Sequence, residues 1–201
     1  MKKDNGLINK LKIYFDKTYS FKEIPIDKKS ILSSVAIILK GGASYPELLF
    51  IKRAERADDV FSGHMAFPGG VKEETDENIL STAIRETAEE VGLDLHQDGE
   101  LIGRFDDYRP VTPSANDFIV SPFIFYIKKP NITLIKNSDE VEDVIWIGLD
   151  KLKKLLPGSK RTTNKFNREY QDYVFDHEGY RIWGMTGKIL HSFITKIDGI
   201  K

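Results

Sequence analysis

The chain has 201 residues, of which 40% are hydrophobic and 30% are charged, a composition typical of one globular domain with a sizeable core. Its 30 Lys and Arg residues nearly balance its 31 Asp and Glu residues, so no overall basic field exists to attract nucleic acid. The lack of cysteine excludes disulfides, zinc–thiolate sites and thiol catalysis.

The apolar segments of the chain are too short to predict a membrane span. The longest, Ile31–Leu39 and Phe118–Ile127, fall well below the about 18 to 20 residues that a spanning helix needs. Lys10 and Lys12 interrupt the apolar stretch near the N-terminus, so no signal-peptide core forms. We therefore expect a cytoplasmic protein with no membrane and no nucleic-acid partner.

The first third of the chain predicts one helix and three strands. Apolar residues at helical spacing in Leu7–Phe15 predict a short amphipathic helix. A buried strand is expected at Ile31–Leu39, a second strand at Leu48–Ile51 and a short third strand at Met65–Phe67.

A longer helix is predicted at Glu77–Val91. Residues that can be buried recur on one face at about 100° per residue, and they are Leu80, Ala83, Ile84, Thr87 and Val91. Asp76 is expected to cap the N-terminus of this helix, where negative charge is favourable. Gly92 is expected to end the helix in a left-handed conformation.

The second half of the chain alternates strands and helices irregularly. Strands are predicted at Leu101–Tyr108, Phe118–Ile127 and Val141–Ile147. Helices are predicted at Asp150–Leu156 and Met185–Ile197, a polar loop at Ser159–Arg168, and a hairpin joining Glu169–Phe175 to Tyr180–Trp183. This order predicts an α/β fold with a mixed β-sheet between helical layers.

The predicted central helix carries three carboxylates, Glu86, Glu89 and Glu90, at positions i, i+3 and i+4. Like charges at this spacing repel by a few tenths of a kcal/mol per pair. A hard divalent cation such as Mg²⁺ or Mn²⁺ would offset that repulsion. Glu86 and Glu90 are positioned to bind one ion, and Glu89 a second ion or the proton of a water. The alternative is a solvated acidic helix face.

Residues around the acidic helix extend this pattern. We expect Arg85 to hold Glu77, two turns earlier, and so to fix the preceding acidic loop against the helix. Gly69 and Gly70 allow the backbone to pass close to a ligand, where a side chain would block it.

The turn and the helix together resemble the signature of the Nudix hydrolases, G-x5-E-x7-R-E-U-x-E-E-x-G-U, where U is aliphatic. Arg85, Glu86, Glu89, Glu90, Gly92 and Leu93 match it in place. Thr87 stands where an aliphatic residue is usual.

One departure in this signature points to a subgroup. Counting back from Arg85 places the early glutamate at Glu77 and the glycine at Val71, but the glycine is Gly70. The loop is therefore one residue longer than the general pattern. This loop, ending in Asp76 and following an F-P-G-G turn, resembles the subgroup that includes coenzyme A pyrophosphatases.

Matches to this subgroup continue outside the signature, and the resemblance covers about residues 31 to 193. The stretch from Leu48 to Gly63 keeps Arg53 and Gly63 of the further upstream motif of coenzyme A pyrophosphatases. It does not keep the spacing of that motif, nor its serine after the arginine. Coenzyme A is therefore one candidate substrate among several.

The resemblance implies a Nudix-like α/β/α sandwich over residues 31–201, preceded by an N-terminal helix and linker over residues 1–30. It implies that water attacks a phosphorus of a small-molecule nucleotide with a diphosphate linkage, with Glu86 and Glu90 as metal ligands. Glu89 would be a ligand or the base, with Arg85 beside it. A further carboxylate often comes from a remote loop, and Glu140 or Glu142 is the best candidate.

Two rival functions stay open at this point. One is a housecleaning hydrolase of nucleoside triphosphates, ADP-ribose or nucleotide sugars. The other is a sensor that binds a nucleotide without cleaving it, although the presence of Glu86, Glu89 and Glu90 argues against a pure binder. The N-terminal helix and exposed aromatic residues also permit a homodimer.

For several other residues, both a functional and a purely structural interpretation are possible. Arg53 is expected either to bind substrate phosphate or to pair with Glu55 or Asp58 on the surface. His64 is expected to be a packed histidine. A solvated loop is favoured over a substrate-closing loop for the basic cluster Lys160, Arg161, Lys165 and Arg168. Core positions are favoured over base stacking for Phe105, Tyr108 and Phe118.

Overall fold

The computed structural model describes residues 6–41, 46–56, 61–112, 115–129, 131–156, 160–165 and 168–200, with backbone alone for 160–165 and 168–171. Its helices are α1 (Gly6–Lys17), α2 (Ile79–Val91), α3 (Leu149–Leu155) and α4 (Gly184–Asp198). Its strands are β1 (Ile31–Lys40), β2 (Glu47–Arg53), β3 (Met65–Ala66), β4 (Gly69–Val71), β5 (Gly99–Arg104), β6 (Phe118–Ile127), β7 (Val141–Gly148), β8 (Lys160–Lys165), β9 (Arg168–Tyr173), β10 (Phe175–His177) and β11 (Tyr180–Ile182).

The main sheet has seven strands and is mixed, as predicted. Strand β1 lies parallel to β6 along its whole length, while β2 and β4 pair with it in the antiparallel sense. Strand β5 pairs antiparallel with β6, and β3 and β7 both pair antiparallel with β2. The early part of β1 is thus bonded to the glycine strand β4 and its end to β2.

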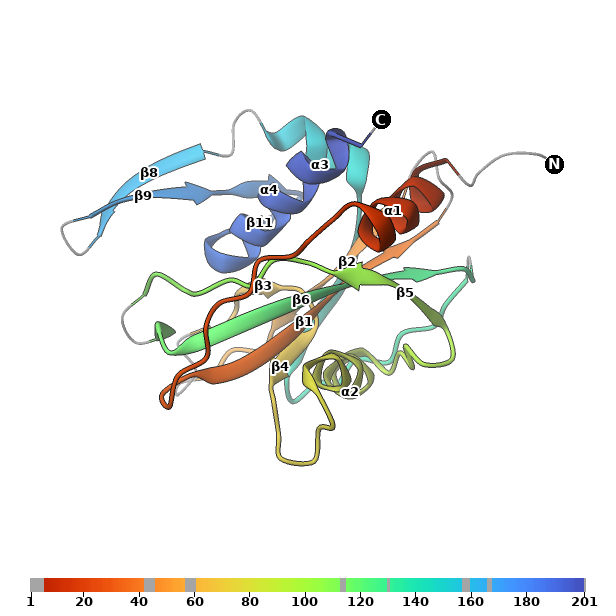
Figure 1. Ribbon diagram of the computed structural model, residues 1–201, viewed down its shortest axis with the longest axis horizontal. Helices are drawn as coiled ribbons and strands as arrows, with labels where there is room; N and C mark the ends of the chain where they lie inside the picture. Colours follow the sequence, from red (N-terminus) through yellow and green to blue (C-terminus); the bar gives the residue numbers. More distant parts are fainter. Residues whose placement is uncertain are drawn as a thin grey trace.

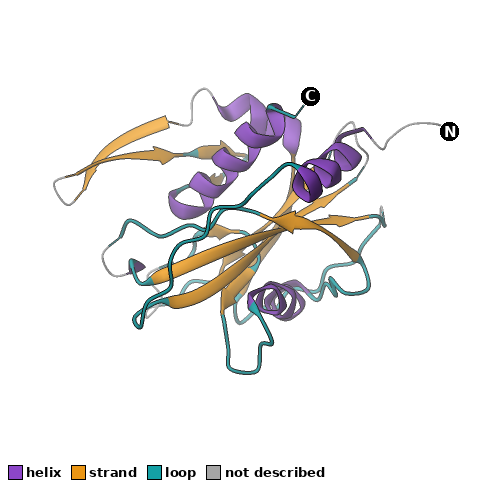
Figure 2. Ribbon diagram, viewed as in Figure 1, coloured by secondary structure: helices purple, strands orange, loops and turns teal. Residues whose placement is uncertain are grey.

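Helices cover both faces of this sheet. In Figures 1 and 2, α1 and α4 lie on one side of the sheet and α2 lies on the other. Side chains alternate between the faces along a strand, so in β1 Ile37 and Leu39 join one core while Ala36 and Ile38 join the other. Burial on both faces explains why Val35–Leu39 is a continuous apolar run. The α/β/α sandwich is therefore confirmed.

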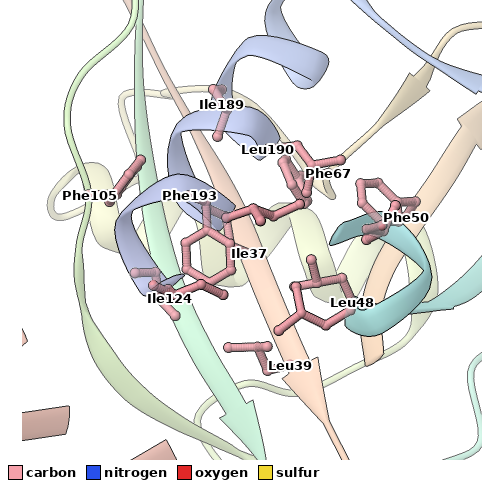
Figure 3. Packing of buried hydrophobic residues seen from close by; sticks show 14 of the residues in the cluster. Ile37, Leu39, Leu48, Phe50, Phe67, Phe105, Ile124, Ile189, Leu190 and Phe193 are labelled. Atoms are coloured by element: carbon pink, nitrogen blue, oxygen red, sulfur yellow. The ribbon is translucent and has the colours of Figure 1, made fainter. Parts of the chain in front are cut away.

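The larger core lies under α1 and α4. Figure 3 shows Ile189, Leu190 and Phe193 of α4 packed over strand residues such as Ile37 and Ile124. Helix α1 contributes Ile8, Leu11 and Phe15, all buried. The N-terminal helix is thus part of the same core as the sheet.

The aromatic residues that could stack on a base are mostly part of the core. The rings of Tyr19 and Phe105 stack with centroids 5.6 Å apart, and Phe105 is fully buried. Tyr108 is also buried and exchanges backbone hydrogen bonds with Val120. Phe118 is half-buried at the start of β6. The core reading therefore holds for Phe105 and Tyr108.

Strands β4 and β8 and the hairpin of β10 and β11 differ from the prediction. The expected polar loop Ser159–Arg168 contains β8, which pairs with β9 in a hairpin that extends away from the main sheet in Figure 1. Its residues show no apolar alternation, so only the backbone pairing reveals the strands. The second hairpin joins β10 to β11, and it is shorter than predicted. The sequence does not predict strand β4, because its two glycines carry no side-chain pattern.

Several expectations fall outside the described residues. Asp58 lies in the gap 57–60, and the side chains of the basic cluster Lys160, Arg161, Lys165 and Arg168 are likewise not described. Within the described ranges, no helix is long and apolar enough to cross a lipid bilayer.

Candidate active site

The glycine turn brings the backbone of β4 against β1 and α2. Gly69 has a φ of 151°, and a Cβ on it would lie 2.6 Å from the Cα of Val35. A Cβ on Gly70 would lie 2.6 Å from the Glu86 Oε2. Position 69 therefore requires glycine, while a side chain at position 70 would displace the carboxylate of Glu86. The space beside Gly70 is filled by the carboxylate of Glu86, where the sequence predicted the approach of a ligand.

Helix α2 begins two residues later than predicted. The Asn78 Oδ1 accepts hydrogen bonds from the backbone N–H groups of Leu80 (2.9 Å) and Ser81 (3.1 Å). The Ser81 Oγ in turn accepts from the Asn78 N–H at 2.9 Å, which completes a capping box. Asn78, and not Asp76, is thus the N-cap. The helix ends at Gly92 in the left-handed conformation, as predicted.

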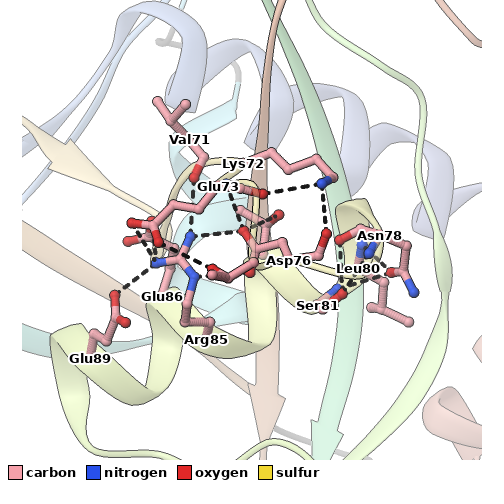
Figure 4. Close-up of polar contacts among 12 residues, drawn as sticks. Val71, Lys72, Glu73, Asp76, Asn78, Leu80, Ser81, Arg85, Glu86 and Glu89 are labelled. Atoms are coloured by element: carbon pink, nitrogen blue, oxygen red, sulfur yellow. Dashed lines mark hydrogen bonds and ion pairs between the residues drawn. The ribbon is translucent and has the colours of Figure 1, made fainter.

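Asp76 makes a two-point contact with Arg85 instead of capping the helix. The Arg85 Nε donates to the Asp76 Oδ1 at 2.9 Å and the Nη2 donates to the Oδ2 at 3.0 Å (Figure 4). The Thr82 hydroxyl and the Glu73 N–H also donate to this carboxylate. The guanidinium holds the pKa of Asp76 well below its usual range. Arg85 therefore ties the acidic loop to α2.

The expectation that Arg85 pairs with Glu77 is wrong. Glu77 is exposed, and the acid that Arg85 binds is Asp76, the residue before it. The spacing carries this signal when it is counted forward from the glycine, because the five intervening residues that follow Gly70 place the signature acid at Asp76. The extra residue of the loop thus lies between Asp76 and Arg85.

Two of the three helix carboxylates face the glycine turn. Glu90 is buried, with 2% of its surface exposed, and accepts a hydrogen bond from the Gly69 N–H at 2.9 Å. Burial raises the pKa of Glu90 to about 8, with Glu86 adding to the rise and the Gly69 hydrogen bond opposing it. Burial also raises the pKa of Glu86, although the Arg85 Nη1 lies 3.0 Å from its Oε1.

Glu89 lies apart from these two carboxylates. Half of its side-chain surface is exposed, and its Oε2 accepts a hydrogen bond from the Arg85 Nη1 at 2.9 Å. Among the described residues, no three His, Asp or Glu side chains converge into a ready metal-binding group. One arginine thus contacts both the half-buried Glu86 and the exposed Glu89.

The structure distinguishes the two candidates for the remote carboxylate. In the β2–β7 pair, Lys52 lies opposite Asp143 and Arg53 opposite Val141, so Glu142 is the extra residue of a β-bulge. The Glu142 Oε1 lies 2.6 Å from the Lys52 Nζ. The carboxylate of Glu140, by contrast, helps to raise the pKa of both Glu86 and Glu90. Glu140 is therefore the better candidate for the remote carboxylate.

Arg53 is the last residue of β2, and His64 directly precedes β3. The positive charge of Arg53 opposes the rise in the pKa of Glu90, and its backbone N–H donates to the His64 carbonyl at 3.0 Å. The His64 ring packs 4.7 Å from the ring of Trp183, in keeping with a packed histidine. Oxygen donors from Glu86, Glu90 and Glu140, with one arginine nearby, suit a hard divalent cation and a phosphate.

Comparison with known protein families identifies one domain. The model of the NUDIX domain matches residues 31–168. An uncharacterized Nudix hydrolase NudL from Salmonella newport is 31% identical over 156 residues, which cover 78% of this chain and 77% of that protein. The peroxisomal coenzyme A diphosphatase NUDT7 of Mus musculus is 28% identical over 175 residues, which cover 84% of this chain and 70% of that protein.

Solved structures show the same fold. A MutT/nudix family protein from Enterococcus faecalis superposes with a TM-score of 0.54 and 20% identity, covering 93% of this chain and 73% of that chain. A MutT protein from Methanosarcina mazei Go1 superposes with a TM-score of 0.50 and 17% identity, covering 87% of this chain and 99% of that chain. At these identities the likeness concerns the fold alone.

Proposed function

Because the chain belongs to the Nudix hydrolase family, whose members act on nucleoside diphosphate derivatives, we propose that it is a metal-dependent pyrophosphohydrolase with coenzyme A as its first candidate substrate. The observation that carries this proposal is the placement of Glu86 and Glu90 against the glycine turn, with Arg53 and Glu140 close enough to act on the charge of Glu90. The similarity to a coenzyme A diphosphatase favours this substrate.

We assign the metal site to Glu86, Glu90 and Glu140. The buried carboxylate of Glu90 has a raised pKa in the protein alone, because burial removes it from water and the Gly69 N–H and the charge of Arg53 offset this only in part. Bound Mg²⁺ or Mn²⁺ would supply Lewis-acid activation of the diphosphate and of the attacking water. Gly69 supports the site by donating its N–H to Glu90, and Gly70 by leaving room for Glu86.

The remaining residues of the proposed site bind the substrate phosphates and accept a proton. Arg53 presents a guanidinium that suits phosphate oxygens. Glu89 accepts the proton of the attacking water, and Arg85 orients its carboxylate through the 2.9 Å hydrogen bond. The water oxygen bonds to one phosphorus, and the bond from that phosphorus to the bridging oxygen breaks. Coenzyme A would yield 3′,5′-ADP and 4′-phosphopantetheine.

A substrate panel tests this proposal. The purified chain is incubated with coenzyme A, ADP-ribose, nucleoside triphosphates and nucleotide sugars, each with Mg²⁺ or Mn²⁺, and products are identified by mass. We expect coenzyme A to have the highest kcat/KM. A strong preference for ADP-ribose or a triphosphate would overturn the choice of substrate. Nucleotide binding without any cleavage would overturn the enzymatic proposal and favour a sensor.

A further inference from the structure

The loop that carries Glu140, residues 135–140, is bonded to the C-terminal end of α2. The last carbonyls of a helix lack partners within it. Here the backbone N–H of Asn137 donates to the Glu90 carbonyl and that of Ile135 donates to the Val91 carbonyl, each at 2.9 Å. The Glu140 loop is therefore placed relative to the helix that carries Glu86 and Glu90.

The other side of the Glu140 loop is bonded to the segment that follows β2. The Ala54 N–H donates to the Glu140 carbonyl at 2.8 Å. The Arg56 Nε donates to the Asp139 carbonyl at 3.1 Å, and the Arg56 Nη2 donates to the same oxygen. The Arg56 N–H is itself bonded to the Ser62 Oγ at 2.7 Å. A side chain thus holds the loop one residue before Glu140.

Electrostatics explains why such a tether is needed. The carboxylate of Glu140 is exposed, and it repels those of Glu86 and Glu90. Without a cation, both repulsion and hydration favour moving Glu140 outward into water. Two N–H groups of one planar guanidinium on a single carbonyl oppose that movement with little further loss of side-chain entropy.

We propose that Arg56 is a positioning residue, which acts through the Asp139 carbonyl to hold the Glu140 loop beside α2, so that a divalent cation can draw Glu140 together with Glu86 and Glu90. This inference rests on the proposed metal-dependent function and names a residue that sets the geometry of its site. Arg56 itself contacts neither cation nor substrate in this assignment.

The binding of Mn²⁺ in the absence of substrate is the direct test. Calorimetric titration compares the wild-type chain with Arg56→Ala and Arg56→Met, which remove both donors, and with Arg56→Lys. We expect about 10-fold weaker Mn²⁺ binding in both donorless variants. This is the smallest loss of affinity that is typical when a residue supporting a metal ligand is removed. Arg56→Lys should be intermediate, because an ammonium can reach the carbonyl but lacks the planar fork.

A matched control is available elsewhere in the chain. The Arg109 Nη1 also donates to a backbone carbonyl, that of Asn116, at 2.6 Å, and Arg109 is not part of the carboxylate cluster. Arg109→Ala should therefore bind Mn²⁺ as the wild type does. Circular dichroism verifies the fold of each variant, and any folded donorless variant with wild-type affinity overturns the inference.

A double-mutant cycle separates positioning from a general loss of structure. Glu140→Gln should weaken Mn²⁺ binding, and adding Arg56→Ala to it should cause no further loss, because both changes act through one carboxylate. Losses that multiply would overturn the inference. If the wild type binds Mn²⁺ tightly but cleaves no nucleotide, the proposed function fails while the role of Arg56 is still decided by the cycle.

Discussion

Arg85 and Asp76, nine residues apart in sequence, form a two-point ion pair with distances of 2.9 Å and 3.0 Å. The Asp76 side chain is almost wholly buried, with 3% of its surface exposed. The same guanidinium also reaches Glu86 and Glu89. A single arginine therefore couples the closure of the acidic loop to the orientation of two carboxylates of the proposed site.

Asp76→Asn should destabilise the protein. The substitution keeps the size of the side chain and removes the charge that faces Arg85, and a hydrogen bond to a charged group is worth about 2 kcal/mol. Urea denaturation measures the free energy of unfolding. The control is Asp176→Asn, which breaks an exposed pair with Arg181 and should cost less than about 1 kcal/mol. Equal losses in the two variants would contradict the buried role of Asp76.

The raised pKa of Glu90 predicts a pH dependence of stability in the metal-free protein. Between its unfolded pKa of 4.5 and its folded pKa of about 8, the folded state binds a proton that the unfolded state has lost. Stability attributable to Glu90 should therefore increase as the pH falls from about 8 toward 5.

Thermal unfolding in EDTA from pH 5.5 to 8.5 checks this dependence. Glu90→Gln removes the titrating group at nearly constant shape, so the difference in Tm between the wild type and the variant should grow as the pH rises. Parallel profiles for the two proteins would show that Glu90 does not titrate in this range.

Glu90→Gln should also reduce turnover by about 10²-fold or more while the protein stays folded, because it removes charge at the proposed metal site. Steady-state kinetics with the best substrate of the panel, alongside circular dichroism, measures both effects. Glu74→Gln, in the exposed part of the acidic loop, is the control and should turn over normally. Near-normal activity in folded Glu90→Gln would refute the metal assignment.

Glu140→Gln and Glu142→Gln should differ sharply. The first removes a charge that acts on Glu86 and Glu90, and we expect a higher Mg²⁺ or Mn²⁺ concentration at half-maximal activity. The second removes only an exposed partner of Lys52, and its metal dependence should match the wild type. The assay is a metal titration of the initial rate. A larger shift in Glu142→Gln would reverse the assignment of the remote carboxylate.

Local patterns predicted much of the fold. Apolar runs and helical periodicity located β1, β6 and α2 to within about two residues, because burial against neighbours leaves a period along the chain. They did not reveal β4 or β8. Gly69 and Gly70 have no side chains to alternate, and β8 has no apolar face, so their strands depend on backbone pairing with distant partners.

The sequence by itself determined the acidic helix, the glycine turn and the family signature, because these lie within one stretch of local spacing. Only the tertiary structure decided that Arg85 binds Asp76 and not Glu77, and that Glu142 pairs with Lys52 while Glu140 lies within electrostatic reach of the helix carboxylates. The physical reason is that both choices depend on through-space distances. A one-residue loop extension sets the first, and a β-bulge between β2 and β7 sets the second.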